Sequence, residues 1–334
     1  MTIYDIAKQL NVSPATVSKV INNYPDVSVK TREKVQNFLK EINFHPNAQA
    51  QSLSTKKSWM IGVVYYEETG VGLSHPYFSA IIDSFKKSVE AEGYSIHFGS
   101  KNSRLMNDNY LDYFRYRNVD GIVVFCTDQN DKQTWQMIES DIPVVVIDMK
   151  IDGATTITSD NELGCRMAID YLVGLGHRKI AHIAGCRGNN WASQVRERGF
   201  IEAMTQNQLP ILPGFIQYGQ DFTFESGYQA MKLLLANSER PTAVFSASDL
   251  MAAAAIEAIN DAGLRVPEDI SVIGFDDIEL AKFLKPKLTT IRQNTAELGK
   301  NAAKLLVKHI DKIQTEVDFV VPVEFIERQS CKKI

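Results

Sequence analysis

The chain has 334 residues, 44% of them hydrophobic and 23% charged, which is the composition of a globular protein with material for more than one core. It contains no run near the roughly 18 apolar residues of a membrane span, and its first residues lack the basic and then apolar segments of a secretory signal. The four cysteines are far apart and form no C-x-x-C pair. These features argue against a membrane protein or a disulfide-stabilised secreted protein, and they predict a location in the cytoplasm.

Charge is distributed unevenly along the chain. The net charge is −4, yet residues 1–57 hold eight Lys and Arg against four Asp and Glu, a net charge of +4. The rest of the chain holds 28 basic and 36 acidic residues. A basic head on an acidic body favours a polyanionic partner that binds the head alone, although such asymmetry can also arise by chance.

Three amphipathic helix patterns follow one another in residues 1–46. The first begins after Thr2, the second after Ser13 with Pro14 at its first position, and the third after Ser28. Their apolar stripes at helical spacing are Ile3, Ile6, Ala7 and Leu10; Val17, Val20 and Ile21; and Val35, Phe38, Leu39 and Ile42. The short joint "NVS" between the first two helices is typical of a helix-turn-helix, whose second helix enters the major groove of DNA.

The outer face of the second helix carries Thr16, Ser18, Lys19 and Asn22, which are small or polar and can form hydrogen bonds. Such a face contributes little to a core and suits contacts with base edges. The sequence therefore predicts a DNA-binding head. The alternative is a small three-helix bundle without a role in nucleic-acid binding.

The head resembles the lactose/galactose repressor (LacI/GalR) family through "D-I-A", "V-S-x-A-T-V-S-K-V-I-N", "V-S-x-x-T-R-E-K-V", "H-P-N-A" and "A-x-S-L". The resemblance implies that Pro14, Ala15 and Lys19 face base edges. Lys19 stands where the family usually has Arg, so it lacks the bidentate fork and its discrimination is softer. Phosphate or sugar contacts are implied for Ser13, Thr16, Ser18, Asn22, Ser28 and Thr31. For Thr16 and Ser18 the alternative is plain solvated helix surface.

Residues 47–57, "NAQAQSLSTKK", contain small residues and one large apolar residue, Leu53. This segment is shorter than the roughly 12–15 residues that an isolated helix needs in water. The family resemblance implies a hinge helix that forms on operator DNA, with Asn47, Ala50 and Leu53 at the DNA and Leu53 wedged into a base step of the minor groove. The alternative is an inert linker whose Leu53 packs on the body.

From residue 58 on, apolar runs alternate with amphipathic stretches, and helices are expected near 161–175, 192–207, 226–236 and 249–262. This pattern predicts parallel sheets covered by helices on both faces. The predicted fold class is an all-α helix-turn-helix head joined by a hinge helix to an α/β periplasmic-binding-protein-like core of two doubly wound parallel-sheet subdomains. The expected boundaries are a head of 1–46, a hinge of 47–57 and a core of 58–334. Within the core, the N-subdomain covers about 58–159 plus 290–318, and the C-subdomain about 160–289 plus 319–330.

Polar and aromatic side chains at the carboxyl ends of the predicted strands are candidates for an effector site, because ligands bind there in such sheets. A carboxylate and an arginine that each take two hydroxyls suit a polyol, and an aromatic face suits a sugar ring. The residues, some from the strand pattern and some implied by the family, are Tyr77, Phe78, Asp148, Trp191, Arg196, Phe222, Ser248 and Asp276. Asp148 could instead hold a turn, and Trp191 and Phe78 could be core residues.

No catalytic, metal-ligand or cofactor motif is found: the six histidines are scattered, and neither G-x-x-x-x-G-K-[ST] nor G-x-S-x-G occurs. We therefore expect no enzyme, cofactor or metal. The family resemblance instead implies a repressor that binds pseudo-palindromic operator DNA and an effector, and the candidate carboxylates and arginine suit a sugar in that role. No leucine heptads end the chain, so a homodimer is expected. Three alternatives stay open: a nucleobase effector, a phosphorylated carrier protein bound around residues 80–117 as corepressor, and a solute-binding protein.

The implied wedge gives the first prediction. Leu53→Ala removes the side chain that would enter the base step, so specific operator binding should weaken much more than non-specific binding. Fluorescence anisotropy at fixed salt measures both affinities. An equal loss on the two kinds of DNA would contradict the wedge.

Overall fold

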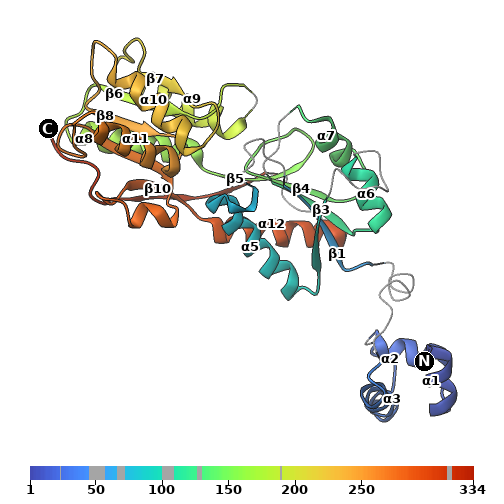
Figure 1. Cartoon of the computed structure of the whole chain (residues 1–334). Helices are drawn as coiled ribbons and strands as arrows, with labels where there is room; N and C mark the ends of the chain where they lie inside the picture. Colours follow the sequence, from blue (N-terminus) through green and yellow to red (C-terminus); the bar gives the residue numbers. More distant parts are fainter. Residues whose placement is uncertain are drawn as a thin grey trace. The chain divides into compact units, whose positions relative to one another are not determined.

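A computed structural model describes residues 1–22, 24–44, 57–65, 72–99, 109–125, 130–188, 190–313 and 318–334. The chain forms two compact units, Met1–Trp59 and Met60–Ile334, which Figure 1 colours along the sequence. The first is called the head unit and the second the core unit. The predicted hinge residues Asn47, Ala50 and Leu53 lie outside the described residues.

The described part of the head unit forms the helices α1 (Ile3–Leu10), α2 (Pro14–Ile21) and α3 (Val29–Glu41). All three begin where the sequence predicts, because the hydroxyl of the preceding residue accepts a hydrogen bond from the backbone N–H three residues further on. The predicted stripes meet in one small core, whose buried members are Ile6, Ala7, Leu10, Val17, Val20 and Val35. Because Val17 and Val20 face inward, the opposite face of α2 is left on the surface.

The first sheet of the core unit is parallel throughout, with the strand order β11-β5-β4-β3-β1-β2. Its strands are β1 (Met60–Tyr65), β2 (Ser95–Phe98), β3 (Gly121–Phe125), β4 (Val144–Ile147), β5 (Thr155–Ser159) and β11 (Asp318–Val321). One face is covered by α5 (Pro76–Ala91) and α12 (Thr295–Ile310), and the other by α6 (Tyr110–Arg117) and α7 (Lys132–Ile138). A short 3-10 turn, Gly72–Ser74, precedes α5. The central strands are apolar along their whole length because both faces are buried.

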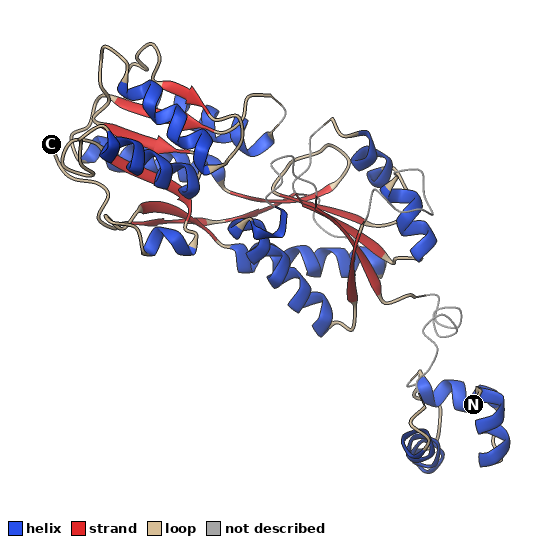
Figure 2. Ribbon diagram, in the orientation of Figure 1, coloured by secondary structure: helices blue, strands red, loops and turns tan. Residues whose placement is uncertain are grey.

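The second sheet has the order β12-β10-β9-β8-β6-β7, and only the β10–β12 pair among these is antiparallel. Its strands are β6 (Ile180–Ala184), β7 (Ile216–Tyr218), β8 (Ala243–Ser246), β9 (Ser271–Asp276), β10 (Thr289–Gln293) and β12 (Val323–Ile326). The helices α8 (Asn161–Gly174) and α9 (Trp191–Gln206) cover one face, and α10 (Phe224–Leu235) and α11 (Asp249–Asp261) the other. A 3-10 helix, Glu279–Lys282, follows β9. Figure 2 shows both sheets between their helices.

The chain passes between the two sheets after β5, after β10 and between β11 and β12, where Pro322 stands. The expected subdomain boundaries at 289/290 and 318/319 are therefore wrong by a few residues. β10 pairs with β9 in the second sheet, and β11 pairs with β5 in the first. The apolar pattern marks both segments as strands, but pairing partners depend on tertiary contacts. Pro322 has no N–H to donate, which suits it to the break between strands of different sheets.

The four helices predicted after residue 160 correspond to α8, α9, α10 and α11 within two residues at each end. Four elements have no counterpart among the predictions: β5, α6, α7 and α12. The run "TTITS" of β5 is rich in threonine, and the two helices α6 and α7 are only eight and seven residues long. Short elements with few aliphatic residues carry weak periodicity, and their burial in the sheet stack compensates for this. The helix α12 is different, because it has 16 residues and buries Leu298, Leu305 and Leu306 on one face, so its helical periodicity was present in the sequence.

Gly299 in α12 marks the closest approach to α5. A Cβ atom there would lie 2.6 Å from the backbone oxygen of Ile81 and 2.6 Å from the backbone nitrogen of Phe85. We expect Gly299→Ala to lower the free energy of unfolding by about 1–3 kcal/mol, since backbone atoms cannot move aside without separating the helices. Urea denaturation measures the change. Gly174→Ala in α8 is the matched control, because nothing lies within 4 Å of that Cβ position; equal losses in both variants would contradict the prediction.

Candidate functional site

The outward face of α2 is small and polar in the structure, as the sequence predicts. Ser13 caps the helix by accepting a hydrogen bond from the Thr16 N–H at 3.0 Å, and Pro14 occupies the first turn. Ala15 and Lys19 are exposed, while Thr16, Ser18 and Asn22 are partly exposed. Lys19 forms an ion pair with Asp26, in the loop that follows α2. These residues form one surface that can face a DNA groove.

A second polar group lies at the start of α3. Ser28 accepts a hydrogen bond from the Thr31 N–H at 3.3 Å, and the two hydroxyl oxygens lie 2.9 Å apart. The N-terminus of a helix carries a partial positive charge and unpaired N–H groups, so it favours phosphate. Capping and phosphate contact are compatible roles for Ser28.

In the core unit, a buried polar cluster forms where the two subdomains meet. The Tyr77 hydroxyl, from α5, lies 2.9 Å from Gln293 Oε1 and 3.2 Å from Asp148 Oδ1. Gln293 ends β10 in the second sheet, and its Nε2 donates to Asp276 Oδ1 at 2.6 Å. One chain of hydrogen bonds thus connects α5 of the first subdomain with the end of β9 in the second.

Arg196 extends this cluster within the second subdomain and is only 3% exposed. Its Nε donates to Asn161 Oδ1 at 2.8 Å, and its Nη1 donates to the Ala247 carbonyl at 2.7 Å and lies 3.7 Å from Asp276 Oδ1. The guanidinium carbon lies 4.0 Å from the centre of the Phe275 ring. The hydrogen bonds to Asn161 and Ala247 thus use Nε and Nη1 of the guanidinium, which holds five N–H donors in all.

Desolvation changes the acidity of the carboxyl groups in the cluster. It raises the pKa of Asp148 from 3.8 to about 6 and that of Asp276 to about 7, although the nearby Arg196 charge acts in the opposite direction. Burial also raises the pKa of Tyr77 well above its ordinary value, so its hydroxyl stays protonated. The cluster therefore holds acidic groups whose charge changes near neutral pH, surrounding a single arginine.

Four of the eight predicted effector residues are joined in this cluster: Tyr77, Asp148, Arg196 and Asp276. Phe78 lies beside it, with its ring centre 5.0 Å from that of Tyr77, and packs in the first hydrophobic core. Ser248 caps α11, directly after the carbonyl that Arg196 binds.

The last two predicted residues lie at other points of the second subdomain. Phe222 covers Gly185 at the end of β6, since a Cβ there would lie 2.4 Å from its ring. Trp191 begins α9 and packs against the core formed by α6 and α7 of the first subdomain. Among the described residues, neither side chain forms a hydrogen bond or ring contact with the cluster. Phe78 and Trp191 thus pack in or against hydrophobic cores, and their effector contacts stay a prediction.

Two members of the cluster, Gln293 and Asn161, were not among the predicted site residues. Each stands where the chain leaves one sheet for the other: Asn161 follows β5 and Gln293 ends β10. The sequence does show that each is a polar residue at or just after the end of a strand. Many strand ends carry such a residue, so this pattern could identify Gln293 and Asn161 only once it was known where the chain passes from one sheet to the other.

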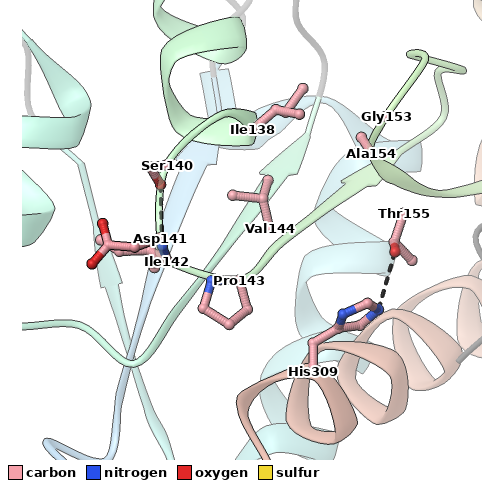
Figure 3. A pocket seen from close by; sticks show the side chains of 10 residues that line it. All are labelled: Ile138, Ser140, Asp141, Ile142, Pro143, Val144, Gly153, Ala154, Thr155 and His309. Atoms are coloured by element: carbon pink, nitrogen blue, oxygen red, sulfur yellow. Dashed lines mark hydrogen bonds between the residues drawn. The ribbon is translucent and has the colours of Figure 1, made fainter. Parts of the chain in front are cut away.

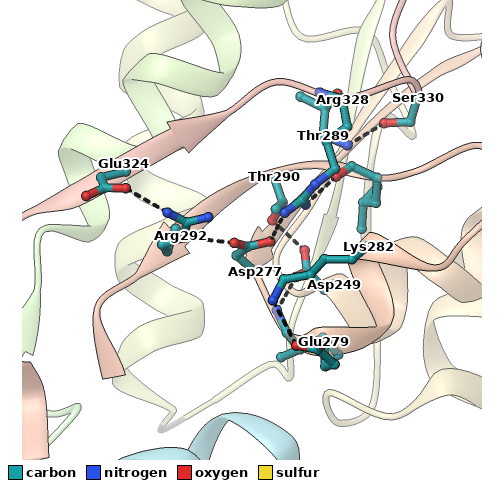
Figure 4. A network of polar contacts seen from close by, with 12 residues as sticks. Asp249, Asp277, Glu279, Lys282, Thr289, Thr290, Arg292, Glu324, Arg328 and Ser330 are labelled. Atoms are coloured by element: carbon teal, nitrogen blue, oxygen red, sulfur yellow. Dashed lines mark hydrogen bonds and ion pairs between the residues drawn. The ribbon is translucent and has the colours of Figure 1, made fainter. Parts of the chain in front are cut away.

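Asp276 has an unusual backbone conformation that its neighbours hold in place. Its φ is 117°, and that of Asp277 is 58°, so two successive non-glycine residues adopt positive φ. The Asp277 side chain is buried, and its carboxylate accepts hydrogen bonds from Arg292 Nε at 2.8 Å and Arg328 Nη2 at 2.5 Å (Figure 4). These two bonds stabilise a turn that would otherwise cost about 1–3 kcal/mol per strained residue.

The same network reaches the chain crossings. Arg292 Nη1 donates to Glu324 Oε2 of β12 at 3.0 Å (Figure 4). The Asp249 carboxylate accepts from the Ile278 N–H at 2.9 Å. Arg292 and Gln293 are consecutive in β10, so one contacts Asp277 and the other Asp276. The position of the Asp276 carboxylate, a predicted effector contact, is therefore fixed by residues of β10, β12 and Arg328.

A separate cavity of about 230 Å³ lies at the opposite, amino-terminal ends of β4 and β5. Figure 3 shows its lining, which includes Ser140, Thr155 and His309. Its polar groups bond to each other, as in the 3.0 Å contact between Thr155 Oγ1 and His309 Nε2. None of the predicted effector residues lines it.

In the described part of the chain, no group of three His, Cys, Asp or Glu side chains could hold a metal ion. None of the described helices is long and apolar enough to cross a bilayer.

A helix-turn-helix with an outward polar face, on the same chain as a two-subdomain α/β core with a buried polar cluster, defines the class of DNA-binding regulators with a ligand-binding core. Comparisons with known proteins agree. Residues 2–47 match the bacterial regulatory proteins of the lacI family, and residues 169–331 match the periplasmic binding protein-like domain.

Full-length relatives and solved structures extend the match to the whole chain. "Probable HTH-type transcriptional repressor ExuR" of Bacillus subtilis (strain 168) is 35% identical, and the match covers 100% of this chain and 99% of that protein. The transcriptional repressor PurR of Haemophilus influenzae (strain PittEE) is 36% identical over the same shares. The lac repressor dimer bound to operator and the anti-inducer ONPF has a TM-score of 0.86 at 30% identity, with 99% of each chain covered.

The chain therefore belongs to the lacI family of bacterial regulatory proteins. It is a DNA-binding transcriptional regulator with an effector-binding core, as the resemblance of its head had implied.

The raised pKa of Asp148 predicts a pH dependence of stability. Between about pH 4 and pH 6 the folded protein keeps a proton on Asp148 that the unfolded chain releases, so this carboxyl lowers the free energy of unfolding as pH rises. From pH 4 to pH 7 this effect lowers the free energy of unfolding by an amount on the order of 2 kcal/mol, and Asp148→Asn should abolish that decrease. Urea denaturation across this range measures it.

The control for this prediction is Asp141→Asn. Asp141 is exposed, and its hydrogen bond from Arg115 lowers its pKa, so its contribution has the opposite sign. A pH profile of Asp148→Asn parallel to that of the unchanged protein would contradict the prediction.

Proposed function

We propose that the protein is a repressor of carbohydrate-utilisation genes whose operator affinity changes when a sugar or sugar derivative binds between its two subdomains. The observation that carries this proposal is the cluster of Tyr77, Asp148, Gln293, Asp276 and Arg196, which spans the two subdomains at the carboxyl ends of their strands. Carboxylate and guanidinium groups that are held rigidly suit the paired hydroxyls of a sugar.

Two solved relatives support a small-molecule effector. One is the transcriptional regulator CelR in complex with cellobiose, 30% identical with a TM-score of 0.75 over 99% of each chain. The other is the lac repressor bound to operator and ONPF. The effector would exchange the direct contact between Tyr77 and Gln293 for contacts of its own, and so change the balance between subdomain arrangements.

On the DNA side, the proposed contacts are those of the outer face of α2 and the start of α3, with the hinge residues Asn47, Ala50 and Leu53 in the minor groove. Pro14, Ala15 and Lys19 would face bases, and Ser13, Thr16, Ser18, Asn22, Ser28 and Thr31 would contact phosphate or sugar. We propose that a homodimer in the cytoplasm binds a pseudo-palindromic operator, since paired half-sites require paired heads.

Thermal unfolding of the full-length protein with neutral sugars, glycosides, sugar phosphates and nucleobases tests the effector site. A compound present at about 100 times its dissociation constant should add roughly 2.7 kcal/mol of stability, which corresponds to a shift of several degrees. Tyr77→Phe removes one hydroxyl of the cluster and should reduce the shift. Tyr228→Phe, whose hydroxyl bonds Asp261 outside the cluster, should keep it.

The outcomes separate the alternatives. A shift given by nucleobases alone would replace the sugar by a base as effector. No shift with any compound would favour a phosphorylated carrier protein as corepressor, and a shift that both tyrosine variants keep would place the effector elsewhere.

A further inference from the structure

The recognition helix has its only charge paired inside the head unit. α2 has the sequence "PATVSKVI", so Lys19 is its one charged side chain. The Lys19 ammonium forms an ion pair with the Asp26 carboxylate, and the two side chains are 48% and 52% exposed. In this state the outer face of α2 presents no unpaired charge to DNA.

The loop that carries Asp26 is held against the end of α2. The Tyr24 N–H donates to the Lys19 carbonyl at 2.9 Å, and the Arg32 guanidinium donates to the Tyr24 carbonyl. Val27 packs against the head core. These contacts on both sides of Asp26 fix the loop, so the carboxylate is placed beside Lys19 by the fold. The hydrogen bond from Lys19 also holds the pKa of Asp26 below its ordinary value, which keeps the pair charged near neutral pH.

A base contact by Lys19 competes with this pair. The acceptors that lysine binds in the major groove are guanine O6 and N7, and they need the same ammonium group. Lysine has three N–H donors, so one bond to Asp26 could persist, but the carboxylate would then lie near electronegative base edges and phosphates. The chain must either release Lys19 from Asp26 or accept that repulsion.

We infer that Asp26 is a specificity-determining residue that limits operator affinity by competing with DNA for the Lys19 ammonium. The inference rests on the role of Lys19 in the proposed function. Surface ion pairs are weak, so the expected effect is a moderate change in affinity, about two- to fivefold. The pair thus adjusts how strongly the recognition helix binds its operator.

The test uses the full-length protein and a fluorescent duplex that this protein selects from a randomised pool, with a scrambled duplex of equal length beside it. Asp26→Asn should tighten binding to the selected duplex about two- to fivefold. Glu41→Gln is the matched control, because it removes one exposed negative charge of the head at the end of α3. Both variants are also made with Lys19→Met, which keeps the length of the side chain without its charge.

The inference is supported if Asp26→Asn tightens binding more than Glu41→Gln, if the gain is absent on the scrambled duplex, and if it disappears with Lys19→Met. It is overturned if the two variants gain equally, or if the gain of Asp26→Asn persists with Lys19→Met. If Lys19→Met alone leaves the affinity unchanged, the base contact of Lys19 in the proposed function fails as well. If Lys19→Met weakens binding but Asp26→Asn has no effect, only the present inference fails.

Discussion

The buried guanidinium of Arg196 constrains the whole centre of the core unit. A charge that is almost fully removed from water must be paired and hydrogen-bonded, or the fold loses several kcal/mol. Its partners come from the start of α8, the turn before α11 and the end of β9. The hydrogen bonds that pair the Arg196 guanidinium therefore hold the carboxyl ends of several strands together. They create a rigid polar site at the place where open α/β sheets bind ligands.

The two subdomains are joined by hydrogen bonds of residues next to this arginine. Gln293 accepts a hydrogen bond from Tyr77 of the first subdomain and donates one to Asp276 of the second, so its amide group connects the two. The adjacent Arg292 ties the strained turn at Asp277 to β12, close to the crossing at Pro322. A ligand that changes the Asp276 contacts acts on the same strands that connect the subdomains. This arrangement is the physical basis for the proposed regulation.

The head unit differs from the core unit, because its specificity for DNA depends on an exposed surface. Its core is small, and its caps and stripes leave the outer face of α2 on the outside. On that face the Lys19–Asp26 ion pair and the proposed base contact involve exposed groups, whose interaction energies are small and depend on salt. The core unit can therefore hold its polar cluster together with buried contacts that are costly to break. The exposed contacts of the head unit are weak, so a change in the operator sequence can alter DNA affinity by more than they contribute.

The sequence alone determined the helices of the head, the alternating α/β pattern and the family, because hydrophobic period, capping residues and motif spacing are local properties. It also indicated Asp148 and Asp276 as polar groups at strand ends, and Arg196 in the helix that follows a strand. Only the tertiary structure decided which sheet β10 and β11 join, that Gln293 and Asn161 complete the cluster, and that Lys19 is paired with Asp26. These features depend on which distant segments become neighbours, and that choice is made by packing and hydrogen bonding over the whole chain rather than by any local pattern.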